Sequence, residues 1–495
     1  MKKIAFDNKK YLKIQSDKIK ERIDMYGNKL YLEFGGKLFD DYHASRVLPG
    51  FEPDSKLKVL LSLKDKAEIV IVVNTQDINS LKVRNDIGIT YQDEVARLID
   101  AYNEVGLYVS SVVLSFYSES PIVNEFVKKL EKNNIKVYKH YKINGYPQNI
   151  ALIVSDDGLG KNEYIETTRP LVVVTAPGPG SGKMATCLSQ LYHDNKRNIN
   201  AGYAKYETFP IWNLPLKHPI NIAYEAATVD LMDVNMIDPF HLESYGLMAT
   251  NYNRDVETFP LLKAIFEKIY GKSPYNSPTD MGVNMCGYAI IDENIAIKAS
   301  KDEIIRRYYQ TLKNNYLGKY DDECVTKAEM LMNQAYVSTD DRKCVAACLK
   351  KQKKEQVPTM AIELNNGKIV TGKRSTLFSA SAALLINTLK CLGHIDDSLK
   401  LISPRVIEPI IKLKVNDLHN HNPRLHISEV LIALAMQAST NPLSELALKQ
   451  LSKLKGLQAH SSNLIDEVDL NTFRKLGIDV TEEPVSFAKR LYKSK

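Results

Sequence analysis

Two patterns of apolar residues alternate through the first half of the chain. Short β-branched runs predict buried strands over residues 68–74 and 171–175, and apolar residues at helical spacing predict a helix over 91–105. Further strands are expected over 149–155 and 220–225. Strands that alternate with helices are typical of an α/β protein with a mostly parallel, layered sheet.

The pattern changes after residue 254. Helical stripes dominate residues 255–348, which predicts a mainly helical middle domain. A charged run over 350–356 then precedes a hairpin pattern with its turn at 365–367, followed by apolar helices, as in a smaller C-terminal α/β domain. Because 495 residues are too many for one core, we divide the chain into three domains. Their boundaries are 1–254, 255–348 and 349–495.

A glycine-rich loop, TAPGPGSGK, separates the strand at 171–175 from a helical pattern that begins near Ser181. Glycine accepts positive φ, so the backbone N–H groups of such a loop can turn toward an anion. The helix N-terminus adds partial positive charge and Lys183 adds a full charge. This P-loop-like strand, loop and helix predict a phosphate or nucleotide site. The residues expected to hold the ligand are Gly178, Gly180, Ser181, Gly182, Lys183 and Thr186.

The loop departs from the usual G-x-x-x-x-G-K-[ST] pattern at two positions. Pro177 replaces the first glycine, and Met184 replaces the hydroxyl residue that binds magnesium. A thioether does not ligate magnesium, which prefers oxygen. Thr186 or Ser181 would have to supply that hydroxyl, although neither has its offset. The alternative interpretation is a tight strand-to-helix turn that binds nothing.

Acidic residues gather at and after the strand expected over 220–225. Glu225 would end that strand, and Asp230 and Asp233 would lie on adjacent turns of a helix. In P-loop enzymes an acidic residue that follows a hydrophobic strand holds magnesium. Glu225, Asp230 and Asp233 are therefore the predicted metal ligands, and a solvated acidic helix face is the alternative.

A histidine-rich segment, DLHNHNPRLH, occupies residues 417–426. His419, His421 and His426 are enough to hold zinc with one position left for water, although their spacing matches no common zinc motif. The alternatives are a substrate- or phosphate-binding role for Arg424 and His426, and a polar loop that caps the next helix. Residues 372–376 precede another predicted helix and are a further candidate for an anion.

Composition restricts the partners. The net charge of +7 is spread along the chain, so no nucleic acid is expected. No apolar run approaches the roughly 20 residues of a membrane span, and no signal-peptide pattern is present, so no membrane partner is expected. Six scattered cysteines without a C-x-x-C pair suit a reduced cytoplasmic setting.

We also expect the protein to form a homo-oligomer.

The TAPGPGSGK loop at 175–183 and the HNPRLH segment at 421–426 resemble those of an uncharacterised bacterial family, the domain of unknown function 1846. The resemblance extends over the whole chain and includes residues 277–284. It implies that the loop is a family feature. It brings no established reaction, although some members carry the label of ATP-dependent peptidases.

Three hypotheses of function remain. The first is a nucleotide-dependent enzyme that uses ATP and magnesium for transfer or ligation on a small phosphate-containing molecule, with Lys183, Arg424 and His426 as catalytic residues. Its active site is expected in a cleft between the first and third domains. The second hypothesis is a metal-dependent hydrolase built on the histidine segment, and the third is a non-catalytic ligand-binding or assembly protein.

Overall fold

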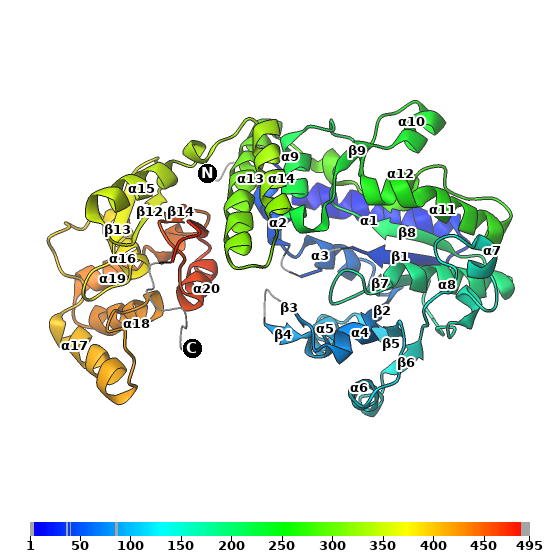
Figure 1. Cartoon of the computed structure of the whole chain (residues 1–495), viewed down its shortest axis with the longest axis horizontal. Helices are drawn as coiled ribbons and strands as arrows, with labels where there is room; N and C mark the ends of the chain where they lie inside the picture. Colours follow the sequence, from blue (N-terminus) through cyan, green and yellow to red (C-terminus); the bar gives the residue numbers. More distant parts are fainter. Residues whose placement is uncertain (1–3, 36–37, 40, 85–87, 487–495) are drawn as a thin grey trace. The chain divides into compact units, whose positions relative to one another are not determined.

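The chain forms two compact units, each with its own sheet (Figure 1). The computed structural model describes residues 4–35, 38–39, 41–84 and 88–486. The first unit comprises residues 1–225 and 233–300, and the second comprises 226–232 and 301–495. The predicted helical region 255–348 is therefore divided between them. The large parallel sheet and the separate C-terminal sheet confirm the predicted α/β class.

Seven parallel strands form the sheet of the first unit, in the order β11-β8-β1-β7-β2-β5-β6. The predicted strands at 68–74 and 171–175 are confirmed as β2 and β7. Both are buried along their apolar runs because helices cover both faces of the sheet. The strands are β1 (Leu30–Phe34), β2 (Ala67–Asn74), β5 (Tyr108–Ser115), β6 (Lys136–Lys139), β7 (Leu171–Thr175), β8 (Gly202–Tyr206) and β11 (Gly282–Val283). Two small ribbons add β3 (Val83–Arg84), β4 (Ile89–Thr90), β9 (Asn235–Ile237) and β10 (Thr250–Tyr252).

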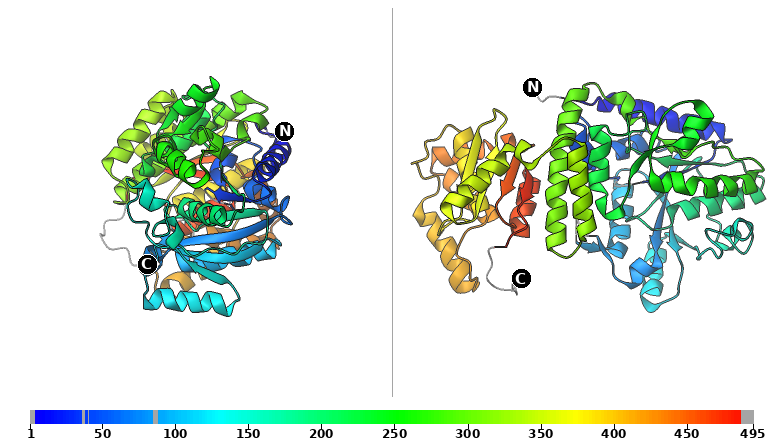
Figure 2. Two further views of the ribbon diagram at one scale, coloured as in Figure 1. Left: turned by 90° about the vertical axis from the view of Figure 1, so that its right-hand side faces the viewer. Right: turned by 45° about the horizontal axis from the view of Figure 1, so that its top comes forward.

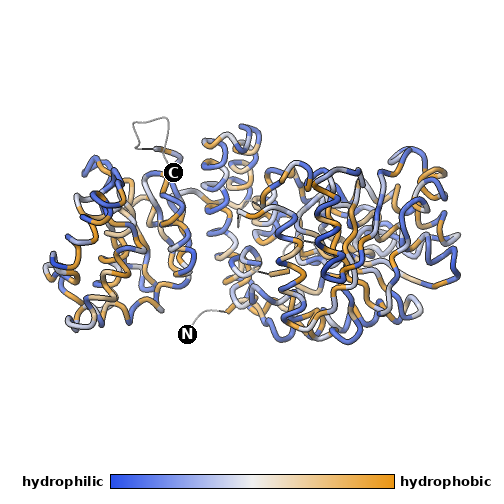
Figure 3. The backbone as a smooth tube through the Cα atoms, turned by 90° about the horizontal axis from the view of Figure 1, so that it is seen from below, coloured by the Kyte–Doolittle hydropathy of each residue, from blue (hydrophilic) through white to orange (hydrophobic). Residues whose placement is uncertain are grey.

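Helices cover the sheet from both sides. On one face Tyr11 of α1 shares a hydrogen bond with Tyr206 of β8, at 2.8 Å. On the other face Tyr31 of β1 donates to Asp194 of α8, at 2.7 Å. The helices carry both hydrophilic and hydrophobic positions (Figure 3), as expected when one side of each packs against a sheet. The helices of the first unit are α1 (Asn8–Met25), α2 (Tyr42–Val47), α3 (Ser55–Leu61), α4 (Thr75–Asn79), α5 (Tyr91–Glu104), α6 (Pro121–Lys132), α7 (Ile150–Ile153), α8 (Lys183–Lys196), α9 (Pro219–Ala227), α10 (Pro239–Tyr245), α11 (Asn253–Tyr270) and α12 (Pro278–Met281). Helix α13 (Glu293–Tyr316) begins in the first unit, and most of its residues belong to the second.

Two predicted strands are wrong. Residues 149–155 contain the helical turn α7, whose N-cap Asn149 accepts a hydrogen bond from the backbone N–H of Leu152. Residues 220–225 lie in helix α9, which begins at Pro219, a residue favoured in the first turn of helices. A short apolar run has the same composition in a buried strand and in a buried helix, so periodicity could not separate them.

The second unit is built on a mixed four-stranded sheet in the order β13-β12-β14-β15. The predicted hairpin is confirmed as β12 (Thr359–Glu363) and β13 (Ile369–Lys373), and β14 (Gln458–Ser461) and β15 (Asp479–Glu482) complete the sheet. Helix α16 packs directly on β13, since a Cβ atom at Gly372 would lie 2.3 Å from the backbone nitrogen of Leu384. Figure 2 shows this unit from two further directions. Its helices are α14 (Asp322–Gln334), α15 (Lys343–Glu355), α16 (Ala380–Leu392), α17 (Pro404–Lys412), α18 (Ile427–Ala438), α19 (Pro442–Leu448) and α20 (Glu467–Lys475).

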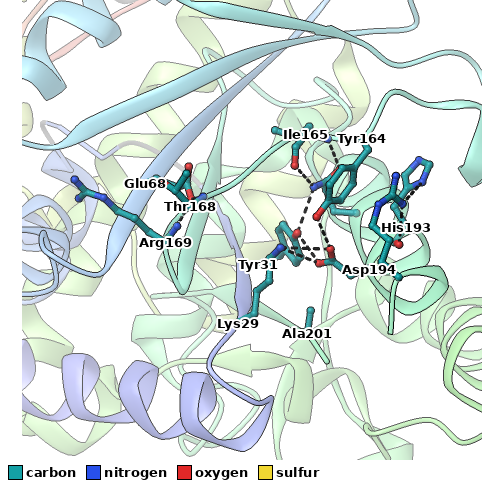
Figure 4. A network of polar contacts seen from close by, with 12 residues as sticks. Lys29, Tyr31, Glu68, Tyr164, Ile165, Thr168, Arg169, His193, Asp194 and Ala201 are labelled. Carbon is teal, nitrogen blue, oxygen red and sulfur yellow. Dashed lines mark hydrogen bonds and ion pairs between the residues drawn. The ribbon is translucent and has the colours of Figure 1, made fainter. Parts of the chain in front are cut away.

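A buried carboxylate ties helix α8 to the amino end of the large sheet (Figure 4). Asp194 is fully buried and accepts hydrogen bonds from the hydroxyls of Tyr31, at 2.7 Å, and Tyr164, at 2.8 Å. The Lys29 ammonium lies 3.3 Å from the same carboxylate. Burial and the Asp194 charge raise the pKa of Tyr31 well above its usual value. Three donors thus satisfy one buried charge.

Replacing Asp194 with alanine should lower the free energy of unfolding of the first unit by about 3–5 kcal/mol, because it leaves a partly buried ammonium and two hydroxyls without their acceptor. Urea denaturation followed by fluorescence measures this, since the single tryptophan, Trp212, belongs to the first unit. Asp156→Asn is the control: its side chain is 79% exposed and pairs with Lys196, so the change should stay below about 1 kcal/mol. Equal effects of the two substitutions would contradict the assignment.

Candidate functional site

The glycine-rich loop and two charged residues, Glu33 and Lys205, lie at the carboxyl edge of three neighbouring strands, β7, β1 and β8. Glu33 on β1 lies opposite Val174 of β7 and Lys205 of β8. After β1 the chain passes to α3, which shares the face of α1 through a Ser16–Ser62 hydrogen bond. After β7 it passes to α8 on the other face. Adjacent strands that continue to opposite faces open a crevice at their carboxyl ends, where α/β proteins bind ligands.

The glycine-rich loop lies at this edge. It joins β7 to α8, and the helix begins at Lys183, two residues later than predicted. Gly180 and Gly182 have φ values of 71° and 86°, which favour glycine. The loop is held internally, because the Ser181 hydroxyl donates to the Gly178 carbonyl at 2.6 Å and the Thr186 hydroxyl donates to the Gly182 carbonyl at 3.1 Å. Both hydroxyls considered for magnesium are therefore engaged with loop carbonyls.

Neighbouring elements fix the position of the loop. The Ser115 hydroxyl at the end of β5 donates to the Ser181 carbonyl, at 2.6 Å. A Cβ atom at Gly178 would lie 2.2 Å from the hydroxyl oxygen of Tyr91. Gly178 therefore leaves room for the Tyr91 side chain of α5, a role that the sequence did not reveal.

The start of α8 provides donors for an anion. A helix leaves the N–H groups of its first turn without intrahelical partners, and the N-cap Gly182 has no side chain that could accept them. Lys183 is partly exposed there. Within the described residues no carboxylate lies within 4 Å of its ammonium group. A ligand that carries phosphate would match both features.

Glu33 connects the loop with the next strand. Its carboxylate is buried and accepts a hydrogen bond from the Tyr203 hydroxyl of β8, at 2.7 Å. Burial raises the pKa of the Cys187 thiol on α8, the Glu33 charge adds to the rise, and the Lys183 charge opposes it. Glu33, Cys187 and Lys183 are thus near enough for their charges to interact.

A buried charge cluster follows on β8, and sequence reasoning missed it. The Lys205 ammonium lies 3.1 Å from Glu207 and forms a closer ion pair with Asp255 of α11. The side chains of Lys205, Glu207 and Asp255 are only 13%, 11% and 16% exposed. Glu207 also lies against Gly282, where a Cβ atom would come within 2.8 Å of its Oε2. Segment 277–284 therefore makes room for this carboxylate.

Two carboxylates share one ammonium in this cluster, and this arrangement shifts the pKa values of Glu207 and Lys205. Burial raises the pKa of Glu207 to about 7; Lys205 opposes this rise, and Asp255 adds to it. Burial acts to lower the pKa of Lys205, but Asp255, Tyr252 and Glu207 together hold it well above its usual value. Strongly shifted groups at a sheet's carboxyl edge are typical of functional sites.

Stacked aromatic rings form one wall of the cluster. The Lys205 ammonium lies 4.9 Å from the ring centroid of Tyr252, a cation–π distance. Tyr252 stacks on Tyr224 at 6.1 Å, and Tyr224 stacks on Phe209 at 5.5 Å. These rings therefore cover one side of the Lys205 ammonium.

The predicted metal ligands do not assemble into one group. Glu225 lies on α9 and its Oε2 accepts a hydrogen bond from the Asn235 N–H, at 3.3 Å. Both oxygens of Asp233 face the Arg254 guanidinium, at 2.6 and 2.9 Å. Asp230 is exposed in a 3₁₀ turn that belongs to the second unit. Among the residues described, no three His, Cys, Asp or Glu side chains are grouped as metal ligands.

The histidine segment has separate surroundings in the second unit. His419 and His421 are exposed and line an open hollow of about 410 Å³ with Val415, Asn420 and Pro423. His426 begins α18, and its Nδ1 lies 3.5 Å from the buried carboxylate of Asp469. The nearby Asp469 carboxylate raises the pKa of His426. The zinc hypothesis gains no support from this arrangement.

Two family descriptions cover nearly the whole chain. "Domain of unknown function DUF1846, N-terminal" matches residues 4–336, and "Domain of unknown function DUF1846, C-terminal" matches residues 340–492. UPF0371 proteins of Streptococcus pyogenes serotype M5 and of Streptococcus uberis are each 55% identical over 493 residues, which is 100% of both chains. No helix in the described part of the chain is long and apolar enough to cross a membrane. The chain belongs to the DUF1846 family, an uncharacterised family.

Proposed function

We propose that this protein is an enzyme that binds a phosphate-bearing small molecule, with ATP or another nucleotide as the first candidate, at the carboxyl edge of β7, β1 and β8. One observation supports this most: the loop with Lys183 and the buried Lys205–Glu207–Asp255 cluster occupy strands separated only by β1. Neighbouring strands lie about 4.8 Å apart, so β7 and β8 are roughly 10 Å apart. A single small ligand spans that distance.

Phosphate binding is assigned to the loop. The first-turn N–H groups of α8 and the ammonium of Lys183 would hold the phosphate oxygens, while Gly180 and Gly182 allow the backbone to turn. The helix dipole favours the same negative charge. We expect magnesium to bind only as a complex with the nucleotide, because Mg²⁺ is commonly held by substrate phosphates and one or two carboxylates.

Proton transfer is assigned to Glu207. A general base works best when its pKa lies near the operating pH, and burial brings Glu207 to about 7. It would accept a proton from a hydroxyl or amine substrate as that group attacks a phosphoryl or acyl centre. The bond from that centre to a nucleotide or phosphate oxygen breaks in the same step, and the nucleotide or phosphate leaves. Lys205 would stabilise the negative charge that develops, in a site that the aromatic rings cover on one side. Transfer or ligation on a small molecule is the reaction class that uses both parts.

Lys183→Ala should weaken the binding of Mg-ATP or inorganic phosphate at least about tenfold, because a hydrogen bond to a charged group contributes about 1.5–3 kcal/mol. Isothermal titration calorimetry on the full chain measures this. Lys196→Ala is the matched control, since it removes a lysine from the last turn of the same helix, where the ammonium pairs with Asp156 on the surface. If the unmodified protein binds no nucleotide, phosphate or sulfate, the loop is only a turn.

Glu207 should hold its proton up to a pH of about 7, whereas an ordinary glutamate has a pKa of 4.5. Difference infrared spectroscopy should show a protonated carboxyl band that titrates near 7 and disappears in Glu207→Gln. The pKa of Glu207 is higher in the folded state than in the unfolded state. Glu207 therefore raises the free energy of unfolding fully below about pH 4.5, and this contribution is lost as the pH rises through 7.

Glu207→Gln should remove this pH dependence of the free energy of unfolding. Glu243→Gln, at an exposed position on α10, serves as the control and should change neither the band nor the stability profile. A wild-type band that titrates below pH 5 would refute the role given to Glu207.

A further inference from the structure

Two segments that the sequence analysis treated separately meet in the second unit. Residues 374–379 follow β13, and residues 422–427 lead into α18. The Leu425 N–H donates to the Leu377 carbonyl at 2.8 Å, and the Ser379 N–H donates to the Leu425 carbonyl at 3.1 Å. Phe378 and Leu425 form an isolated parallel bridge. The backbone therefore fixes the two segments side by side.

This pairing brings two arginines together. Nε of Arg424 donates to the carbonyl of Ser375, at 2.8 Å, directly beside Arg374 in the chain. Another N–H of Arg424 faces Asn422 Oδ1 at 3.4 Å. These contacts use two of the five N–H donors of the Arg424 guanidinium and hold it in place. Burial, together with the like charge of Arg424, lowers the pKa of Arg374.

Two nearby basic side chains, unlike this arginine pair, each have a carboxylate partner. Lys414 lies 2.8 Å from the Glu429 carboxylate, and His426 lies 3.5 Å from Asp469. Asp469 is engaged further, because it also accepts hydrogen bonds from the Ile427 N–H and the Ser379 hydroxyl. Among the described residues, neither Arg374 nor Arg424 has a carboxylate within 4 Å.

We propose that Arg374 and Arg424 form an oxyanion site of the second unit, which takes the phosphate group of a small phosphorylated molecule. Two adjacent guanidinium groups without a counter-charge repel each other, and a bound dianion removes that repulsion. The planar fork of arginine matches two phosphate oxygens at once, and the anchored Arg424 loses little conformational freedom on binding. This site is independent of the glycine-rich loop of the first unit.

Arg424 and His426, both predicted as catalytic residues, have different contacts and therefore receive different roles. Arg424 would contact the ligand, whereas His426 is held by Asp469 and begins α18. His426 is then a positioning residue, because its backbone N–H bonds the Glu429 carboxylate, at 2.7 Å, and Glu429 in turn holds Lys414.

The test uses the full chain with the Lys183→Ala substitution, so that phosphate binding by the first-unit loop is at least tenfold weaker. Calorimetric titration with inorganic phosphate should show one remaining site. Adding Arg374→Ala or Arg424→Ala should weaken this site at least tenfold, and Arg424→Lys should weaken it as well because the fork is lost. Arg405→Ala, at an exposed position on α17, is the control and should change nothing.

Sulfate should compete with phosphate for this site, and acetate should not. Phosphate should also raise the melting temperature of the Lys183→Ala protein but not that of the Lys183→Ala/Arg374→Ala protein. Arg374→Ala relieves repulsion, so without ligand this variant should melt no lower than its parent. No phosphate binding in the Lys183→Ala protein, or equal binding after Arg374→Ala, would refute the proposal, and neither result would bear on the loop.

Discussion

The insertion of β7 between β1 and β2 is the constraint on which the first unit depends. A parallel strand in this position is buried on both faces, which requires the apolar run at Leu171–Thr175. The chain must reach it from β6 at one edge of the sheet and leave it toward β8 on the other side of β1. The turn after β7 therefore sends α8 to the face opposite α3. Glycines in the turn, the position of the α8 N-terminus and the change of face between β1 and β7 follow from that one placement.

Two buried groups of charged side chains lie at opposite ends of this sheet, and they differ in how many donors each carboxylate has. At the amino end three donors surround the single carboxylate of Asp194, so every charge and hydroxyl has a partner. At the carboxyl end two carboxylates, Glu207 and Asp255, share Lys205, and burial raises the pKa of Glu207 to about 7. The first arrangement suits stability, whereas the second keeps a titratable group at the edge of the sheet where α/β proteins commonly bind ligands. In the second unit Arg374 and Arg424 show the reverse imbalance, two cations with no carboxylate within 4 Å among the residues that the structure describes.

The family match covers both units of the chain but identifies no reaction. The two family descriptions meet between residues 336 and 340, and the relatives in Streptococcus match over their full length. The residues that we propose as ligand-binding therefore lie in a pair of domains that these Streptococcus relatives share. Nucleotide, magnesium, a homo-oligomer and a site shared between domains stay predictions.

The sequence alone determined the α/β class, strands β2 and β7 and the start of α8 to within two residues, because these depend on local apolar periodicity and glycine chemistry. It failed where local signals are equal: the apolar run at 220–225 fits a strand as well as the helix it forms. Lys205 and Glu207 alternate on one strand and were a readable hint, but Asp255 lies 48 residues beyond Glu207 and joins them only when α11 packs against β8. Arg374 and Arg424, 50 residues apart, meet only through backbone pairing. Only the tertiary structure decided these groupings, because burial and charge pairing are set by which distant elements the sheet brings together.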